Sequence, residues 1–418
     1  MASKYYALTH AVADAIAEAT SVDSAYNARL KAVANGTYVS TETHLSTSPG
    51  LDDRPDSSWS TTEVAMWWAA LDVADQKALM ADPFNWELLG NTDGLPAAVR
   101  DAANRKRLPG MIDDAQREYD AAKTKWDEIS KDFELSSEQM KSYYDAWLKA
   151  EERLTELRTV ESTLTLSKSS DPLSLLVLDG TSGERLKAAV AVGDVDSAKH
   201  VATFVPGMTT NVTDSLAAYT TDMVRLRKAT ADNIYGVSRS DVGTIAWLGY
   251  DAPQSVLSAA MTQKAHAGAN SLTPFLEGMN ASRTTSGTDP HLTLLGHSYG
   301  STTSGFAMSQ MDADVVDDFI MFGSPGSGVQ SVSEYAIDQG SVFVSGVPEG
   351  DWVQGVGPDA AFGINPMRLE GVEHLSNDAT GSANYQDFGF DPFRNHSTYL
   401  DDDTQTLYDI SKVVGGRR

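Results

Sequence analysis

The chain has 418 residues, 41% of them hydrophobic, so it is long enough for two domains with a substantial core. Its formal net charge of −26 argues against binding to nucleic acid or to an anionic membrane surface, since both reward clustered lysine and arginine. Cysteine is absent, which excludes disulfides and thiolate metal sites. No apolar run is long enough to cross a membrane.

Composition and the N-terminal sequence also suggest the charge of the substrate and the cellular location of the protein. Strong acidity slows encounter with anions, so we expect a neutral acyl or ester substrate and no nucleic-acid partner. The first 20 residues lack the continuous apolar core of a secretory signal peptide. We therefore expect a cytoplasmic protein, or one exported without a cleaved signal peptide.

Up to about residue 168 the pattern is typical of helices. Helices are expected within residues 3–34 and 60–82, the latter carrying Trp67 and Trp68, with a loop at 46–58. Apolar residues recur at alternating steps of three and four over 112–133 and again over 140–157.

A helical hairpin follows from these two stripes. Between them Ser136 and Gln139 fit a capping box, so a second helix begins there and forms an antiparallel hairpin. The stripes carry large aromatic residues, which we expect to be buried: Tyr119, Trp126, Tyr143 and Trp147. A partner surface or a homo-oligomer contact is the alternative use of this face.

After residue 168 short apolar runs alternate with helical stretches and glycine-rich turns. Strands are predicted at 173–178, 188–192, 201–205, 244–248, 292–295, 319–322 and 342–344, with a weaker candidate at 367–372. Helical patterns fill 211–232, 253–280 and 301–311. The order predicts an α/β-hydrolase fold with a mostly parallel sheet of roughly eight strands. We divide the chain into a helical N-terminal domain, 1–168, and a catalytic domain, 169–418.

The motif Gly296-His297-Ser298-Tyr299-Gly300 is the most informative segment. It follows the apolar run 292–295 and precedes a stretch of small residues, which is the order of strand, G-x-S-x-G and helix. In an α/β-hydrolase this segment makes a tight turn that exposes the serine hydroxyl at the carboxyl edge of the sheet. Ser298 is therefore the predicted nucleophile.

A serine nucleophile needs a base and an orienting acid, which follow it in the order acid then histidine in this fold. His396 lies beyond the last strand candidate and is preferred over His374 as the base. Asp351 follows the strand at 342–344 and is the preferred acid. The rival acids are Glu349 and Asp359.

The oxyanion of the tetrahedral intermediate needs two backbone N–H donors. One is expected from Tyr299, directly after the nucleophile, and the other from Met208 in the loop after the third strand. Thr209 in that loop and Tyr250 after the fourth strand are the expected substrate-binding residues. The alternative for these two segments is an ordinary turn and a helix cap.

Four motifs, in this order, resemble an actinobacterial α/β-hydrolase family long catalogued as a domain of unknown function. They are Val205-Pro206-Gly207-Met208, Ala246-Trp247-Leu248-Gly249-Tyr250-Asp251-Ala252-Pro253, Gly296-His297-Ser298-Tyr299-Gly300-Ser301 and Gly323-Ser324-Pro325-Gly326. Gly90–Pro96 with Arg100, Asp101, Asn104 and Arg105 also resembles the helical segment that often precedes that domain. The resemblance covers about residues 80–410 and implies the Ser-Asp-His roles for Ser298, Asp351 and His396.

These patterns predict a serine hydrolase that cleaves a carboxylic ester or a related acyl substrate through an acyl-enzyme. The alternatives are an acyltransferase and an interaction or scaffold protein with little turnover. No cofactor is expected. The other histidines have no metal-ligand spacing and no phosphate-binding loop is present, so no metal or nucleotide site is expected either.

Overall fold

The computed structural model describes residues 54–131, 136–338, 340–346, 353, 355–386 and 394–417. These belong to one compact unit, Leu51–Arg418. The helices expected within 3–34, and most of the loop expected at 46–58, lie outside the described residues.

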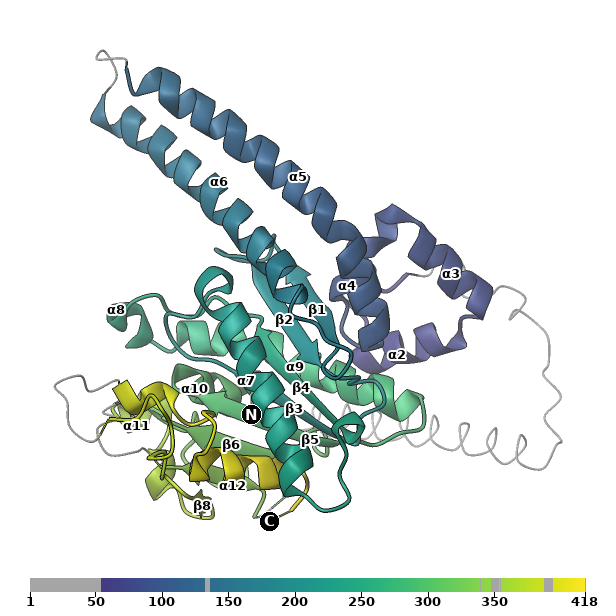
Figure 1. Ribbon diagram of the computed structural model, residues 1–418, viewed down its shortest axis with the longest axis vertical. Coiled ribbons are helices and arrows are strands. Elements are labelled where there is room, and N and C mark those ends of the chain that lie inside the picture. Colours follow the sequence, from purple (N-terminus) through teal and green to yellow (C-terminus); the bar gives the residue numbers. More distant parts are fainter. Residues whose placement is uncertain are drawn as a thin grey trace, which may run out of the picture. The chain divides into compact units, whose positions relative to one another are not determined.

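A single eight-stranded sheet organises the structure (Figure 1). Its strands are β1 (Leu173–Asp179), β2 (Lys187–Val192), β3 (His200–Val205), β4 (Val242–Leu248), β5 (His291–His297), β6 (Asp318–Phe322), β7 (Val342–Ser345) and β8 (Glu373–Leu375). Their order is β1-β2-β4-β3-β5-β6-β7-β8. β2 runs antiparallel to β1 and β4, and the other neighbours are parallel. This confirms the predicted α/β-hydrolase fold.

Helices cover both faces of the sheet, and side chains along each strand alternate between two cores. On one face α7 (Val212–Asn233), α12 (Gln405–Val414) and the end of α6 (Ser137–Leu164) pack on residues such as Val190, Phe204 and Ile320. On the other face α9 (Gln263–Thr285) and α10 (Tyr299–Met308) pack on residues such as Ile245, Leu294 and Met321. Strands β2 to β7 are buried on both sides, which explains their continuous apolar runs.

Three details of the predicted elements are wrong. The helical stretch expected over 253–280 is two helices, the short α8 (Val256–Ala259) and α9. The weak strand candidate at 367–372 is instead a 3₁₀ turn at Pro366–Arg368 after the short α11 (Asp359–Phe362), and the last strand begins later, at Glu373. The helix expected over 60–82 is two helices, α2 (Thr61–Ala70) and α3 (Val73–Ala81), because Asp72 caps α3 with its carboxylate. Periodicity did not reveal that break, although both Trp67 and Trp68 are buried as core residues.

Polar side chains from α4 (Trp86–Asn91) and α5 (Ala97–Ile129) cover the outer edge of β1. An edge strand otherwise presents unpaired N–H and C=O groups to solvent. Here side chains bond to the backbone of Leu173, Leu175, Leu176 and Leu178 at 2.5–3.1 Å; they come from Asn91, Arg100, Asp101, Asn104 and Arg105. The polar residues that precede the sheet in sequence therefore serve as a substitute for a further strand.

The helical hairpin is present, but the expected burial of its aromatics is wrong. Ser136 and Gln139 form the predicted capping box at the start of α6, which packs antiparallel to α5. Tyr119, Trp126 and Trp147 are only partly buried, and Tyr143 is 37% exposed. Trp126 and Trp147 stack on each other, with Tyr144 rather than Tyr143 completing the cluster.

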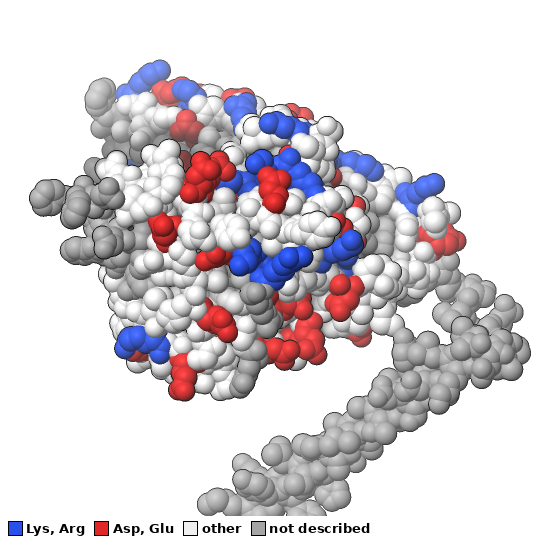
Figure 2. Space-filling view, turned by 60° about the horizontal axis from the view of Figure 1, so that its bottom comes forward, with Lys and Arg blue, Asp and Glu red and all other residues white. Residues whose placement is uncertain are grey.

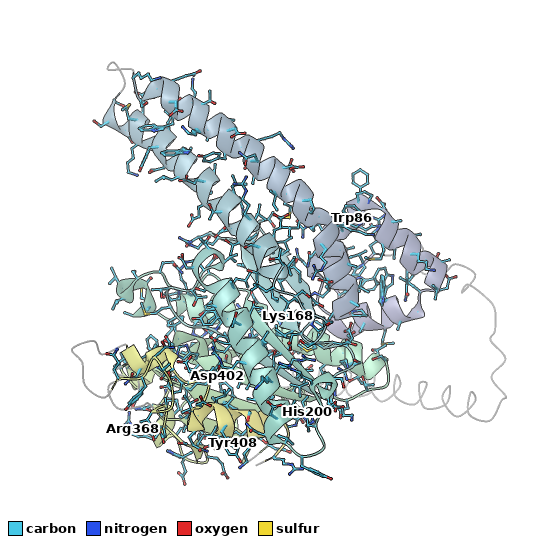
Figure 3. All side chains as sticks on the ribbon, viewed as in Figure 1. Trp86, Lys168, His200, Arg368, Asp402 and Tyr408 are labelled. Atoms are coloured by element: carbon cyan, nitrogen blue, oxygen red, sulfur yellow. The ribbon has the colours of Figure 1, made fainter. Side chains whose placement is uncertain are left out.

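The hairpin joins the main core near the sheet, although Ile129 at its far end is also buried. Leu154, Leu157 and Val160 of α6 share one core with β1 and β2. Trp86 of α4 lies where the helices meet, its indole donating to the carbonyl of Met80 (Figure 3). The division into domains 1–168 and 169–418 stays a prediction.

Over the described residues no helix combines the length and the apolar character that crossing a membrane requires. Acidic and basic side chains are interspersed over the face shown in Figure 2, so neither sign of charge dominates it.

Candidate active site

The segment that carries Ser298 is a tight strand-to-helix turn. β5 ends at His297 and α10 begins at Tyr299, so Ser298 alone makes the turn. Its backbone has φ 56° and ψ −134°, which a residue with a side chain adopts only when its surroundings enforce it. The Ser298 N–H donates to the carbonyl of Phe322 in the neighbouring strand at 3.0 Å.

The two glycines of the motif are required by close packing. A Cβ on Gly296 would lie 2.5 Å from the Cα of Ser301. A Cβ on Gly300 would lie 2.2 Å from the carbonyl oxygen of Val205 in β3. Both distances are shorter than any real carbon contact, so larger residues would force the turn apart and displace Ser298.

The loop after β3 lies directly against Ser298. A Cβ on Gly207 would be 2.5 Å from the Cβ of Ser298, 2.7 Å from its Oγ and 3.0 Å from the Tyr299 nitrogen. Only a glycine therefore lets the backbone that leads to Met208 come this close. Tyr299 is the first residue of α10, so its N–H has no acceptor within the helix.

Residues after β4 hold this loop in place. The hydroxyl of Tyr250 donates to the carbonyl of Pro206 at 2.7 Å, and the Thr209 N–H donates to the carbonyl of Pro253, also at 2.7 Å. Gln254 donates its side-chain amide to the carbonyl of Thr210 at 2.9 Å. Thr209 itself has φ 62°, a conformation that these contacts stabilise.

Tyr250 is placed differently from the expectation that it binds substrate. It is buried, stacks on Trp247 and is not among the residues that line the cavity at Ser298. Burial raises the pKa of Tyr250, so its hydroxyl keeps its proton and remains a donor to Pro206. Its observed role is to position the loop, a contact that no sequence motif signals because it joins residues 44 positions apart.

A cavity of about 340 Å³ opens onto Ser298. This volume falls within the usual range for ligand pockets, roughly 300–1,000 Å³. The described residues that line it are Gly207, Met208, Thr209, Tyr219, Val256, His297, Ser298, Val353, His396 and Ser397. The cavity thus brings together Ser298, His396, Met208 and Thr209, four of the residues singled out from the sequence.

His297 supports the segment that carries His396. Its Nε2 lies 2.7 Å from the backbone carbonyl of His396, and because a carbonyl only accepts, that nitrogen carries the proton. The two rings are 4.5 Å apart between centroids, and His297 also stacks on Phe204 and Phe322. His297 is therefore a packing residue that also holds the backbone of His396 in position.

The acid of the expected triad is outside the described residues, since Asp351 and its rival Glu349 both fall in 347–352. The other rival, Asp359, is described and pairs with Arg368 at 3.1 Å without lining the cavity. His374 sits exposed in β8 and does not line the cavity either.

Three other described histidines do not line this cavity, and His266, in the first turn of α9, stacks on Phe306 instead. His200 and His291 begin β3 and β5, so they lie at the amino ends of the strands, where His200 is labelled in Figure 3. Among the described residues no group of three or more His, Asp or Glu side chains could hold a metal ion.

A family model described as an alpha/beta hydrolase matches residues 181–361. An uncharacterised protein of Mycobacterium tuberculosis is 34% identical over 239 residues, which span 55% of this chain and 85% of the relative. A second uncharacterised protein from that organism is 29% identical over 298 residues, or 68% of this chain and 42% of the relative.

Solved structures with a similar arrangement are more distant. A putative esterase from Staphylococcus aureus has 10% identity and a TM-score of 0.36, with 64% of this chain and 91% of that chain covered. A dienelactone hydrolase from Anabaena variabilis has 11% identity and a TM-score of 0.33, with 58% and 96% covered. At these values the likeness says nothing about the substrate of this chain.

Proposed function

The chain belongs to the α/β-hydrolase family, and from this premise we propose that it is a serine hydrolase of carboxylic esters. The observation that carries the proposal is the strained turn at Ser298, with the backbone of Gly207 pressed against its hydroxyl in a cavity that His396 also lines. A fold that only served as a scaffold would have no need to maintain that strain.

In the proposed mechanism Ser298 Oγ attacks the ester carbonyl while His396 accepts the hydroxyl proton. The tetrahedral intermediate collapses, the alcohol leaves with the proton from His396, and an acyl-enzyme remains. Water then attacks the acyl-enzyme, again with His396 as the base, and releases the carboxylic acid. Asp351 would orient the imidazole and stabilise its charged form.

The N–H groups of Met208 and Tyr299 are the proposed donors to the oxyanion. The close approach of Gly207 to both Ser298 and the Tyr299 nitrogen supports this, because Met208 directly follows Gly207 in the chain. Removing one such donor typically costs about 3 kcal/mol of transition-state stabilisation. Tyr250, through Pro206, would hold the first donor in position.

The described residues favour Asp351 over its rival Asp359 as the acid. Val353, two positions after Asp351, lines the same cavity as Ser298 and His396. Asp359 instead forms an ion pair with Arg368 at the surface. No Asp, Glu, Lys or Arg occurs among the described residues that line the cavity, which supports a neutral substrate.

The test is labelling by a fluorophosphonate probe together with turnover of p-nitrophenyl esters, on the full chain. Wild type should react and turn over, and Ser298→Ala should do neither while keeping its circular dichroism and melting temperature. Equal labelling of Ser298→Ala and wild type would contradict the proposal. Products formed with competing alcohols distinguish a hydrolase from an acyltransferase, which would yield a new ester.

A further inference from the structure

The short helix α8 (Val256–Ala259) belongs to a segment that is fixed at both ends beside Ser298. At its start, the carbonyl of Pro253 accepts from the Thr209 N–H of the loop after β3 at 2.7 Å. At its end, the carbonyl of Met261 accepts from the hydroxyl of Tyr299 at 2.6 Å. The segment thus bridges the two elements that provide the proposed oxyanion donors.

Between these fixed ends the segment presents apolar side chains to solvent. Val256 is 74% exposed, Leu257 is 77% exposed and Met261 is also exposed. Residues 252–263 contain no charged side chain. Contiguous exposed apolar residues on a soluble protein commonly mark a site that another apolar group covers.

This apolar strip is continuous with the cavity at Ser298. Val256 both belongs to the strip and lines the cavity, whose other apolar walls are Met208, Tyr219 and Val353. Val356, in the same turn as Val353, is also exposed. An apolar surface therefore runs from the nucleophile to the outside without crossing a charged group among the described residues.

The other end of the cavity suits a long apolar group less well. A smaller cavity of about 40 Å³ shares Tyr219, His297 and Ser397 with the first. It is also lined by Asp222, a carboxylate paired with Arg225 at 2.7 Å. Its remaining walls are apolar, from Phe204, Phe322, Tyr399 and Leu400, but a volume of about 40 Å³ is too small for an alkyl chain of several methylenes.

Resting on the proposed function, we propose that the substrate is an ester of a medium- or long-chain fatty acid. Its acyl chain would run from Ser298 over Val256 and Leu257, covering the exposed strip. Each methylene that is fully buried raises the affinity for the transition state about fourfold, and one that is half buried about twofold. Reactivity should therefore increase with acyl length up to the end of the strip.

The experiment compares kcat/KM for p-nitrophenyl acetate, butyrate, hexanoate and octanoate, all below their aggregation limits. In wild type the octanoate-to-acetate ratio should be at least about tenfold, in keeping with six added methylenes that are partly buried. In Val256→Ser/Leu257→Ser that ratio should fall roughly fivefold or more. The matched control Val73→Ser/Phe84→Ser alters two exposed apolar residues outside the strip and should keep the wild-type ratio.

The outcomes separate this inference from the proposed function. A flat or falling ratio in wild type, with turnover still abolished by Ser298→Ala, overturns the acyl-chain inference alone. A rising ratio that Val256→Ser/Leu257→Ser leaves unchanged also overturns it, because the chain then lies elsewhere. If no ester is turned over and the probe does not label wild type, the proposed function fails and this inference fails with it.

Discussion

Around Ser298 every neighbouring residue from Leu292 to Gly305 is buried, whereas near the far end of the hairpin Tyr143 and Tyr144 are 37% and 40% exposed. The serine is enclosed by β3, β6 and α10, and its flanking glycines meet backbone atoms of other elements. Trp126 and Trp147 meet mainly each other and Tyr144. One region is held by several layers of structure and the other by a single helix pair.

This difference shows that an apolar stripe on a helix does not by itself ensure that its side chains are buried. A pair of helices buries only the seam between them, so large side chains on the stripe stay partly exposed unless a third layer covers them. The sheet provides that layer for Leu154 and Leu157 but does not extend to Trp147. Substitutions should therefore be severe at the nucleophile, intermediate at the hairpin base and mild at the tip.

The largest effect is expected for substitution of the proposed catalytic base, His396. His396→Ala should lower kcat by about 10⁴-fold or more, because Ser298 would lose its proton acceptor. His374→Ala, at an exposed residue of β8, is the matched control and should stay close to wild type. Ester kinetics at saturating substrate measure both, and a reversed order would reassign the base.

Gly207→Ala tests whether close packing around Ser298 matters for chemistry. The added methyl group would collide with the serine and move the loop that carries Met208, so kcat should fall about 10²- to 10³-fold. Gly110→Ala is the control, since in α5 a Cβ meets no atom within 4 Å and alanine should stabilise the helix by about 0.5–1 kcal/mol. An unchanged kcat in Gly207→Ala would show that close packing around Ser298 is not required for catalysis.

Leu157→Ala and Leu148→Ala compare the base and the tip of one helix. Leu157 is fully buried against the sheet, so its truncation should cost about 2–5 kcal/mol of unfolding free energy. Leu148 is exposed, and its truncation should cost less than about 1 kcal/mol. Urea unfolding measures both, and equal losses would mean that the tip is as well covered as the base.

The smallest expected effect is a pH dependence of the unfolding free energy that comes from Glu156 at the hairpin base. Burial at the hairpin base raises the pKa of Glu156 to about 7, although the Leu186 N–H and Arg153 favour its charged form. Because the folded state binds this proton more tightly than the unfolded state, stability should decline as pH rises from about 4.5 to 7. Glu156→Gln should flatten this decline and add on the order of 1–2 kcal/mol at pH 8.

Unfolding by urea at pH 5 and pH 8 tests this prediction. The exposed carboxylate Glu138, near the tip, offers the matched control Glu138→Gln, which should leave the difference between the two pH values as in wild type. A Glu156→Gln variant with an unchanged difference would show that this carboxylate is not the source of the pH dependence.

The sequence by itself determined the elements whose causes are local. Seven strand segments, the capping box at Ser136 and the strand–serine–helix turn at Ser298 depend on neighbouring residues, so pattern and spacing revealed them. The break at Asp72 and the late start of β8 were missed, because weak periodicity over a few residues does not distinguish a cap or a turn from a continuing element.

Only the tertiary structure decided which patterned faces are covered and which distant residues meet. It assigned the polar residues of α4 and α5 to the edge of β1, moved Tyr250 from the cavity to the support of Pro206, and left the aromatic cluster at Trp147 half exposed. These outcomes depend on contacts between residues far apart in the chain, which composition and periodicity do not encode. An apolar stripe in the sequence identifies one face of a helix. Whether that face is buried in the core depends on which other elements pack against it.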